Sequence, residues 1–345
     1  MKKILLIATG GTIASREDGR GLSPAATGEE LARSVPEIAG LCGLTVVQPM
    51  NIDSTNMRPA DWLRIRDVIA QGYDDHDGFV ILHGTDTMAY TAAALSYLVQ
   101  GSAKPIVLTG SQQPMGAPFT DAKLNIYQSL LYALDDASRD VAIVFGGAVI
   151  AGTRARKQRT MSYNAFKSIN FPPLALIRTE KIIRGTGAGA ACGASADAEA
   201  GGPRPNFHDT LNPRVCALKL TPGLTPAVFG LLKAAYDAII LETFGIGGIP
   251  EYGDGGAGSF QHAIFDWVDS GRTIVMTTQV PEEGMDLGVY EVGRVYADHP
   301  GILKGGDMTT EALVAKTMWV LGQTRDPDRV RELFYAPVNF DRIDG

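Results

Sequence analysis

A threonine preceded by two glycines, near the start of the chain, has the residue type and setting of a catalytic nucleophile. Thr12 follows Gly10 and Gly11, and the apolar run at 4–8 before them is typical of a buried strand of a parallel sheet. The glycines permit a tight turn, so we expect Thr12 at the carboxyl end of this strand, where open α/β sheets bind ligands. The alternative is a turn in which the hydroxyl only caps the next segment.

A second polar cluster follows the apolar run in "VILHGTDTMAYTAAALSYL", residues 80–98. His83, Gly84, Thr85, Asp86 and Thr87 stand in a row before an alanine-rich helix, again at the end of a strand. Capping by Asp86 or Thr87 explains one polar residue well but five in a row poorly. The pattern therefore favours a functional cluster over a helix cap alone.

Two further segments have a functional and a structural interpretation each. The segment "NIDSTNM", residues 51–57, contains Asp53, Ser54 and Thr55, which predict either contacts to a polar ligand or an Asx-rich turn before a helix near Pro59. The segment "GTRARKQRTMS", residues 152–162, carries four cations. They predict a solvated loop, unless one of them, such as Lys157, faces the pocket.

Together these residue types indicate an activated threonine. A threonine hydroxyl is a weak nucleophile, so Thr12 needs a nearby base. Thr85 can serve if Asp86 and a lysine such as Lys157 draw off its proton. For His83 we expect a structural hydrogen bond rather than a catalytic role.

The elements that must position these residues alternate between strand and helix. Strand-like runs recur at 78–84, 105–110, 141–147, 237–245 and 272–278, and amphipathic or apolar helical segments follow several of them. Residues 185–212 lose this periodicity and are rich in Gly, Ala and Pro. We therefore predict an α/β protein with an N-terminal catalytic domain at 1–184, an interdomain linker at 185–212 and a C-terminal domain at 213–345.

The composition narrows the class of partner. The chain has 345 residues and a net charge of −7 without Lys/Arg clusters, which argues against nucleic acid or an anionic membrane as partner and favours a small molecule. The three cysteines are odd in number and widely spaced, and the apolar run before Gly10 is too short for a signal peptide. We expect a cytoplasmic protein.

These motifs resemble those of the bacterial-type L-asparaginase family, and most closely its cytoplasmic type I branch. "ATGGTIAS" and "HGTDTMAYTAAALS" match the two signature motifs, and "NIDSTNM", "AGTRARK" and "GGDMTTEALVAK" extend the resemblance over nearly the whole chain. The resemblance implies a larger N-terminal parallel-sheet α/β domain and a smaller C-terminal α/β domain, in a homodimer or homotetramer. It implies hydrolysis of L-asparagine to L-aspartate and ammonia with no metal and no cofactor.

The resemblance also assigns roles to individual residues. It makes Thr12 the nucleophile that forms an acyl-enzyme, and it makes Thr85, Asp86 and Lys157 the family's second threonine, aspartate and lysine. Asp86 and Thr85 would also bind substrate, together with the segment Asp53, Ser54 and Thr55 around its carboxylate. A backbone oxyanion hole at the glycine turn would stabilise the tetrahedral intermediate.

The sequence departs from the family pattern at two positions. The loop after the nucleophile carries Leu22 about where many members have a tyrosine, so we predict Tyr290 in "MDLGVYEVG" as the helper tyrosine. Glu242 stands where allosteric type I relatives have arginine, which puts an allosteric asparagine site of that kind in doubt. The alternatives are a glutaminase, the amidase subunit of a glutamyl-tRNA amidotransferase, and a noncatalytic amino-acid-binding protein on the same fold.

Overall fold

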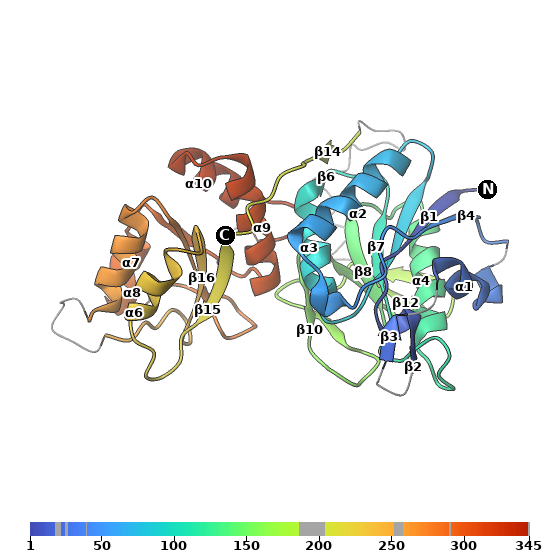
Figure 1. Ribbon diagram of the computed structural model, residues 1–345, viewed down its shortest axis with the longest axis horizontal. Helices are drawn as coiled ribbons and strands as arrows, with labels where there is room; N and C mark the ends of the chain where they lie inside the picture. Colours follow the sequence, from blue (N-terminus) through green and yellow to red (C-terminus); the bar gives the residue numbers. More distant parts are fainter. Residues whose placement is uncertain are drawn as a thin grey trace. The chain divides into compact units, whose positions relative to one another are not determined.

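The computed structural model describes residues 1–17, 22–24, 27–38, 40–185, 204–251, 258–289 and 291–343. The chain forms two compact units, each with its own sheet (Figure 1). Unit 1 comprises residues 1–209 and 338–340, and unit 2 comprises residues 210–337 and 341–345. The larger N-terminal and smaller C-terminal α/β domains predicted from the sequence are confirmed.

The described residues of unit 1 build an eight-stranded sheet that is parallel over most of its width. Its strands, in spatial order, are β13 (Lys181–Arg184), β12 (Ala175–Arg178), β9 (Ala148–Ala151), β8 (Val141–Phe145), β7 (Ile106–Thr109), β5 (Gly78–Leu82), β1 (Lys3–Ala8) and β4 (Gly43–Val47). Pairings from β4 to β8 are parallel, whereas β9, β12 and β13 pair antiparallel. The parallel half carries three of the predicted site segments at its carboxyl edge, after β1, β4 and β5, and the segment 152–162 follows the antiparallel strand β9.

The switch to antiparallel pairing occurs at a two-glycine hairpin. Gly146 and Gly147 have φ values of 56° and 77° and join Phe145 directly to Ala148 across the ladder. Two consecutive positive φ angles fit the twist of a tight hairpin, and glycine adopts them without a Cβ penalty. The run "VAIVFGGAVI" is therefore two strands rather than the single strand expected from its apolar character.

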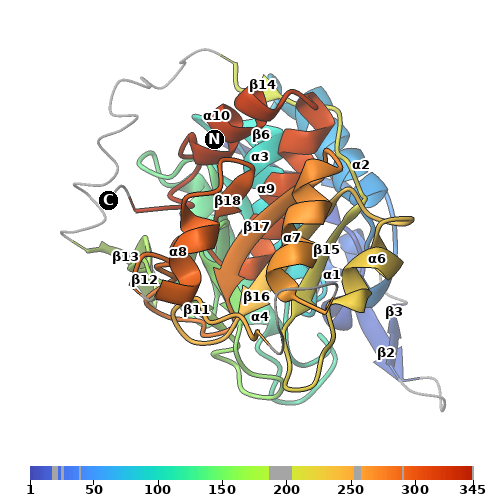
Figure 2. The ribbon, with the colours of Figure 1, turned by 90° about the vertical axis from the view of Figure 1, so that its left-hand side faces the viewer.

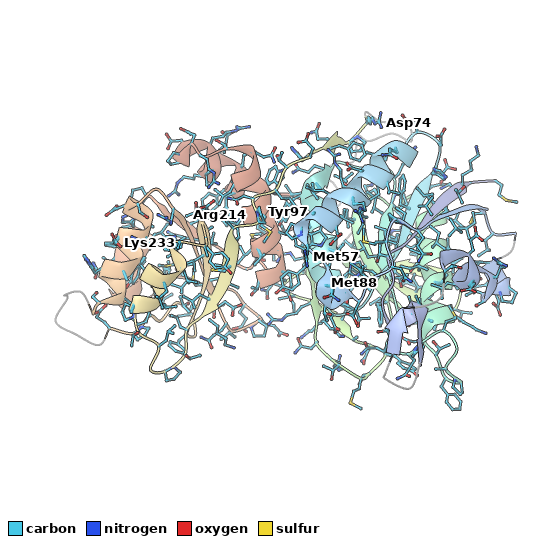
Figure 3. The ribbon with its side chains drawn as sticks, in the orientation of Figure 1. Met57, Asp74, Met88, Tyr97, Arg214 and Lys233 are labelled. Atoms are coloured by element: carbon cyan, nitrogen blue, oxygen red, sulfur yellow. The ribbon has the colours of Figure 1, made fainter. Side chains whose placement is uncertain are left out.

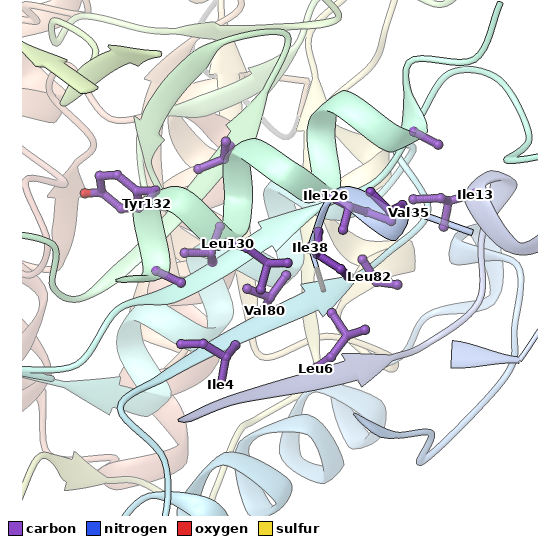
Figure 4. Packing of buried hydrophobic residues seen from close by; sticks show 14 of the residues in the cluster. Ile4, Leu6, Ile13, Val35, Ile38, Val80, Leu82, Ile126, Leu130 and Tyr132 are labelled. Atoms are coloured by element: carbon purple, nitrogen blue, oxygen red, sulfur yellow. The ribbon is translucent and has the colours of Figure 1, made fainter. Parts of the chain in front are cut away.

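Helices cover both faces of this sheet (Figure 1). α2 (Pro59–Gly72) and α3 (Met88–Leu98) lie on one face, and α1 (Gly28–Arg33) and α4 (Ala122–Leu134) lie on the other. Because side chains alternate along a strand, Ile4 and Leu6 point to the same face, where they form one core with Ile126 and Leu130 of α4 (Figure 4). This core fixes β1 and β5 beneath the site.

Short elements complete unit 1. They are η1 (Thr12–Ala14), β2 (Ser15–Glu17), β3 (Leu22–Pro24), η2 (Pro36–Ile38), η3 (Ser54–Asn56), β6 (Val99–Gln100), β10 (Ala155–Lys157), β11 (Phe166–Ser168) and β14 (Asn206–Phe207). β10 pairs with β11, and β14 pairs with β6. The predicted linker at 185–212 stays a prediction, since residues 186–203 lie outside the described residues.

The described residues of unit 2 form a four-stranded parallel sheet in the order β15 (Val215–Lys219), β16 (Ala238–Thr243), β17 (Thr273–Thr278) and β18 (Ile302–Lys304). Its helices are α6 (Ala227–Leu232), α7 (Phe260–Asp269), α8 (Glu291–Ala297), α9 (Thr310–Gln323) and α10 (Pro327–Tyr335). α6 and α7 lie on one face and α9 on the other (Figures 1 and 2). Phe229, Phe260 and Trp267 pack edge to face in this core.

Apart from the run that ends at the Gly146–Gly147 hairpin, the predicted strand runs and the two predicted helices, near Pro59 and within 80–98, appear at their expected places. No helix among the described residues is long and apolar enough to cross a membrane.

Candidate functional site

Three polar segments meet beyond the carboxyl ends of neighbouring strands of unit 1. The Thr9 amide donates to the Leu82 carbonyl at 3.0 Å, which continues the β1–β5 ladder to the strand ends. The Ile52 amide donates to the Thr9 carbonyl at 2.9 Å, and the Gly11 amide donates to the Ile52 carbonyl at 3.0 Å. Residues 9–12, 51–54 and 82–87 therefore converge at one sheet edge.

The two glycines before Thr12 are required by close backbone contacts. Gly10 and Gly11 have φ values of 108° and 82°, which L side chains rarely adopt. A Cβ on Gly11 would lie 2.4 Å from the Gly84 Cα, and a Cβ on Gly10 would lie 2.4 Å from the Ile52 carbonyl oxygen. The tight turn expected from the sequence is present, and it places half-buried Thr12 at the first position of η1 beside the Gly84 backbone.

Lys157 joins the second threonine to the aspartate. Its Nζ donates to Thr85 Oγ1 at 2.7 Å and to Asp86 Oδ1 at 2.7 Å. The side chain of Lys157 is 17% exposed and that of Asp86 is 58% exposed, so the ion pair contributes little to stability. Its geometry is instead suited to polarising the buried Thr85 hydroxyl.

The strand β10 explains why a cation from the segment 152–162 reaches this site. Lys157 ends β10, which pairs with β11 in register with Phe166. Arg154, just before this strand, is fully buried, and its guanidinium lies over the Phe171 ring. Two of the four cations in this segment are therefore structured parts of unit 1 rather than members of a solvated loop.

The segment 51–57 forms the local turn that was one of its two interpretations. Asp53 caps η3, and its Oδ1 accepts from the Thr55 amide and the Thr55 hydroxyl, both at 2.8 Å. Ser54 is buried against Gly84, where a Cβ would approach Ser54 Oγ to 2.5 Å. The turn thus holds Ser54 inside the site, while Asp53 and Thr55 are exposed at its rim.

Asp86 and Thr87 were the two candidates for the N-cap of α3, and neither caps the helix through its side chain. Thr87 occupies the N-cap position without a side-chain capping bond, and its Oγ1 donates instead to the Ser54 carbonyl at 2.8 Å. This bond ties the segment 51–57, which ends at Met57, to the segment 83–87, which Met88 follows; both methionines are labelled in Figure 3. Helix capping therefore does not account for the polar residues at 83–87.

His83 has the structural hydrogen bonds expected from its neighbours. The ring is fully buried; its Nδ1 donates to the Gly84 carbonyl at 2.7 Å, and its Nε2 lies 2.9 Å from Thr91 Oγ1. Trp62 Nε1 donates to the same Thr91 oxygen at 2.9 Å. Because the pKa of His83 is low, the ring is neutral at pH 7; Nδ1 carries its hydrogen, and Nε2 accepts from the Thr91 hydroxyl. Burial lowers the pKa of His83 to about 4, although the bond to Gly84 opposes this shift.

Gln112 belongs to the site but was not predicted from the sequence. Its Oε1 accepts from Thr85 Oγ1 at 3.3 Å. Asp121 holds its backbone, accepting from the Gln112 amide at 3.0 Å and the Gln113 amide at 3.0 Å. A signal was present: "TGSQQ" follows the end of a strand, just as the segments after β1 and β5 do. The same reasoning about strand ends predicts a place at the site for these residues.

Tyr290, the predicted helper of the nucleophile, lies outside the described residues and stays a prediction. Glu242, on β16, accepts from the Thr310 hydroxyl at the start of α9, at 2.5 Å. The described part of the chain contains no group of three or more His, Cys, Asp or Glu side chains that could hold a metal ion.

Two family models match the chain. "Asparaginase, N-terminal" matches residues 3–186 and "Glutaminase/Asparaginase C-terminal domain" matches residues 214–334. The first covers Thr12, the segments 51–57 and 83–87, Gln112 and Lys157, and the second covers most of unit 2.

Individual relatives match over almost the full chain. The chain is 35% identical to an L-asparaginase of Thermococcus kodakarensis, over 96% of each chain. It is 34% identical to a glutamyl-tRNA(Gln) amidotransferase component of Metallosphaera sedula, over 96% of this chain and 74% of that one. Among solved structures, the thermostable L-asparaginase from Thermococcus kodakarensis superposes with a TM-score of 0.86 at 33% identity, over 99% of this chain and 100% of that one.

Proposed function

This chain belongs to the asparaginase family, and on that premise we propose that it is an L-asparaginase that hydrolyses L-asparagine to L-aspartate and ammonia. The observation that carries the proposal is the contact of one lysine ammonium with both Thr85 and Asp86, next to the turn that holds Thr12. A protein that only binds an amino acid has no need of an activated hydroxyl.

In the proposed reaction Thr12 Oγ attacks the carbon of the substrate's side-chain amide. Its proton passes by way of the site base to the amide nitrogen, so the tetrahedral intermediate releases ammonia, and water then hydrolyses the acyl-enzyme to aspartate and free Thr12. Lys157 and Asp86 support Thr85 as the group that takes up the proton. We assign Asp86 and the segment Asp53–Thr55 to the substrate's ammonium and carboxylate, and Tyr290 to the deprotonation of Thr12.

The variant Lys157→Met tests whether the contact of the lysine ammonium with Thr85 and Asp86 is needed for catalysis. Removing the ammonium beside Thr85 should lower kcat for ammonia release from L-asparagine by about two to four orders of magnitude, the range of general acid–base catalysis. Arg156→Met is the matched control, since neighbouring side chains on a strand point to opposite faces. Near-native activity of Lys157→Met would contradict the assigned role.

The second candidate is the amidase half of an amidotransferase, because the identity to the amidotransferase relative, 34%, is close to the 35% for the asparaginase. The discriminating assay is ammonia release from L-asparagine and L-glutamine by the wild-type chain. An asparaginase shows the higher kcat/KM for asparagine. Preference for glutamine would favour a glutaminase or an amidotransferase component.

We further propose that the protein is cytoplasmic and assembles as a homodimer or homotetramer. Sedimentation of the purified chain tests the assembly.

A further inference from the structure

Thr85 Oγ1 has two described partners, and together they fix the direction of its hydrogen. A lysine ammonium has no lone pair to offer, so Lys157 Nζ must donate to the hydroxyl oxygen at 2.7 Å. The hydroxyl hydrogen then points to the other partner, Gln112 Oε1, at 3.3 Å. One lone pair of Thr85 Oγ1 is left to accept a hydrogen bond from the hydroxyl of an attacking nucleophile.

The orientation of the Gln112 amide is determined by its other contacts. Its Nε2 donates to the Arg159 carbonyl at 3.4 Å and to the Ser162 carbonyl at 3.2 Å. Both partners are acceptors only, so the nitrogen must face them and the oxygen must face Thr85. A flipped amide would bring two carbonyl oxygens against Oε1.

The backbone of Gln112 is held just as firmly. Asp121 is 7% exposed, and its two oxygens accept from the Gln112 amide at 3.1 and 3.0 Å. Asn125, itself buried, donates to the same carboxylate at 3.1 Å and to the Gly110 carbonyl at 2.9 Å. The side chain therefore projects from a rigid loop that begins at the end of β7.

We propose that Gln112 is a positioning residue that aims the Thr85 hydroxyl, so that Thr85 meets the nucleophile as a hydrogen-bond acceptor. This inference rests on the proposed function, because it acts through the Thr85 assigned there. It predicts a role for Gln112 in the rate of the chemical step rather than in substrate binding.

The test compares kcat and KM for L-asparagine in the wild type, Gln112→Met and Gln113→Met. Gln112→Met keeps the length of the side chain but loses its strong acceptor, so kcat should fall about tenfold, the factor of one typical hydrogen bond, with KM within about twofold. Gln113 is the matched control, because it is exposed and has the same chemistry. The variant Gln113→Met should retain the wild-type kcat.

Gln112→Glu separates the aiming role from a merely structural one. A glutamate keeps an acceptor oxygen toward Thr85 but loses both donors to the Arg159 and Ser162 carbonyls. The proposal predicts a kcat clearly above that of Gln112→Met, whereas a loop-tethering role predicts that the two variants are equally impaired. Equal impairment, or wild-type kcat in Gln112→Met, would overturn the proposal.

The outcome is distinguishable from failure of the proposed function. If the wild type releases ammonia from asparagine and Lys157→Met does not, the function stands and only the Gln112 results decide whether this residue aims Thr85. A wild-type chain without amidase activity would overturn both.

Discussion

Thr85 illustrates how the chemistry of a single hydroxyl depends on neighbours from separate elements. Its ammonium partner ends β10 and its amide partner follows β7, while the residue itself follows β5. A hydroxyl with an unperturbed environment neither gives up nor accepts a proton readily at neutral pH. The contacts of Thr85, rather than its residue type, therefore make it a candidate base.

His83 gives a prediction at the residue scale. Its pKa of about 4 lies below the ordinary 6.5, so the unfolded chain takes up a proton that the folded chain resists. The contribution of His83 is therefore fully present above pH 6.5 and is lost as the pH falls toward 4. Between pH 7 and pH 4.5 the free energy of unfolding should drop by about 2–3 kcal/mol on account of this residue.

Urea denaturation of the wild type and of His83→Gln at the two pH values measures this contribution. The difference between the two pH dependences isolates His83 from the carboxyl groups that titrate in the same range. The absolute stability of the variant does not matter to the comparison. Parallel pH dependences would contradict the assignment of a buried, neutral ring.

The sequence predicts many of these residues but not their bonds. Thr12, Thr85 and Asp86 could be singled out because polar residues after buried strands gather at one sheet edge. Residue types alone left Lys157 as one of four cations, and the family resemblance singled it out; its contact with Thr85 depends on the β10–β11 pairing, which no local pattern shows. The strand-end signal at Gln112 was overlooked, and its side-chain bonds to Thr85, Arg159 and Ser162 join segments far apart in the chain, which no local pattern shows.

At the scale of elements, the ends of β1 and β5 are held together by contact of two glycine backbones. A side chain on Gly11 would meet the Gly84 Cα and N at 2.4 Å. Alanine at this position must also adopt a φ of 82°, and left-handed backbone at a non-glycine residue costs about 1–3 kcal/mol. The two strand ends, with Thr12 and Thr85 beyond them, must then move apart.

We therefore expect Gly11→Ala to lose at least about 2 kcal/mol of unfolding free energy and most of the amidase activity. Gly116→Ala is the control: Gly116 has no neighbour within 4 Å of a built Cβ and no left-handed φ. It should stay within about 0.5 kcal/mol of the wild type. Denaturation curves and ammonia assays on both variants make the comparison, and equal behaviour would refute the close-contact explanation.

Local sequence patterns predict whether a segment is a strand or a helix more readily than they predict whether two strands pair parallel or antiparallel. The apolar runs of β5, β7 and β8 and the segment of α3 directly indicate strands and a helix. The antiparallel half of the sheet was not predicted, because it depends on the Gly146–Gly147 hairpin inside an apparently continuous apolar run. Recognising two adjacent glycines as a tight turn supplies the missing signal.

At the scale of the molecule, the chain reaches unit 1 a second time near its end. Residues 338–340 belong to unit 1, whereas the segments on either side belong to unit 2. Asn339 Nδ2 donates to Ser96 Oγ at 2.8 Å and to the Val141 carbonyl at 2.9 Å, and its own carbonyl accepts from the Thr153 hydroxyl at 2.6 Å. This return could not be predicted from the sequence because no local pattern marks it.

Asn339→Ala should lower the free energy of unfolding by about 1–3 kcal/mol, since it leaves the Ser96 and Val141 acceptors without this donor. The φ of Asn339 is 46°, which asparagine tolerates better than alanine, so the backbone adds to the cost. Asn206→Ala, at an exposed position of β14, is the control. Equal unfolding midpoints for the two variants would show that the Asn339 side chain does not stabilise the docking of the returning segment on unit 1.

The central claim, that Thr12 is the nucleophile of an asparagine-hydrolysing site, is tested most directly by the ammonia released from L-asparagine by purified Thr12→Ala. Thr12→Ser serves as the control that keeps the hydroxyl. We expect the alanine variant to fold normally and to lose about four orders of magnitude or more in kcat, and the serine variant to retain measurable turnover. A correctly folded Thr12→Ala that releases ammonia within about tenfold of the wild-type rate would contradict the account, because a factor of ten equals only about 1.4 kcal/mol of barrier.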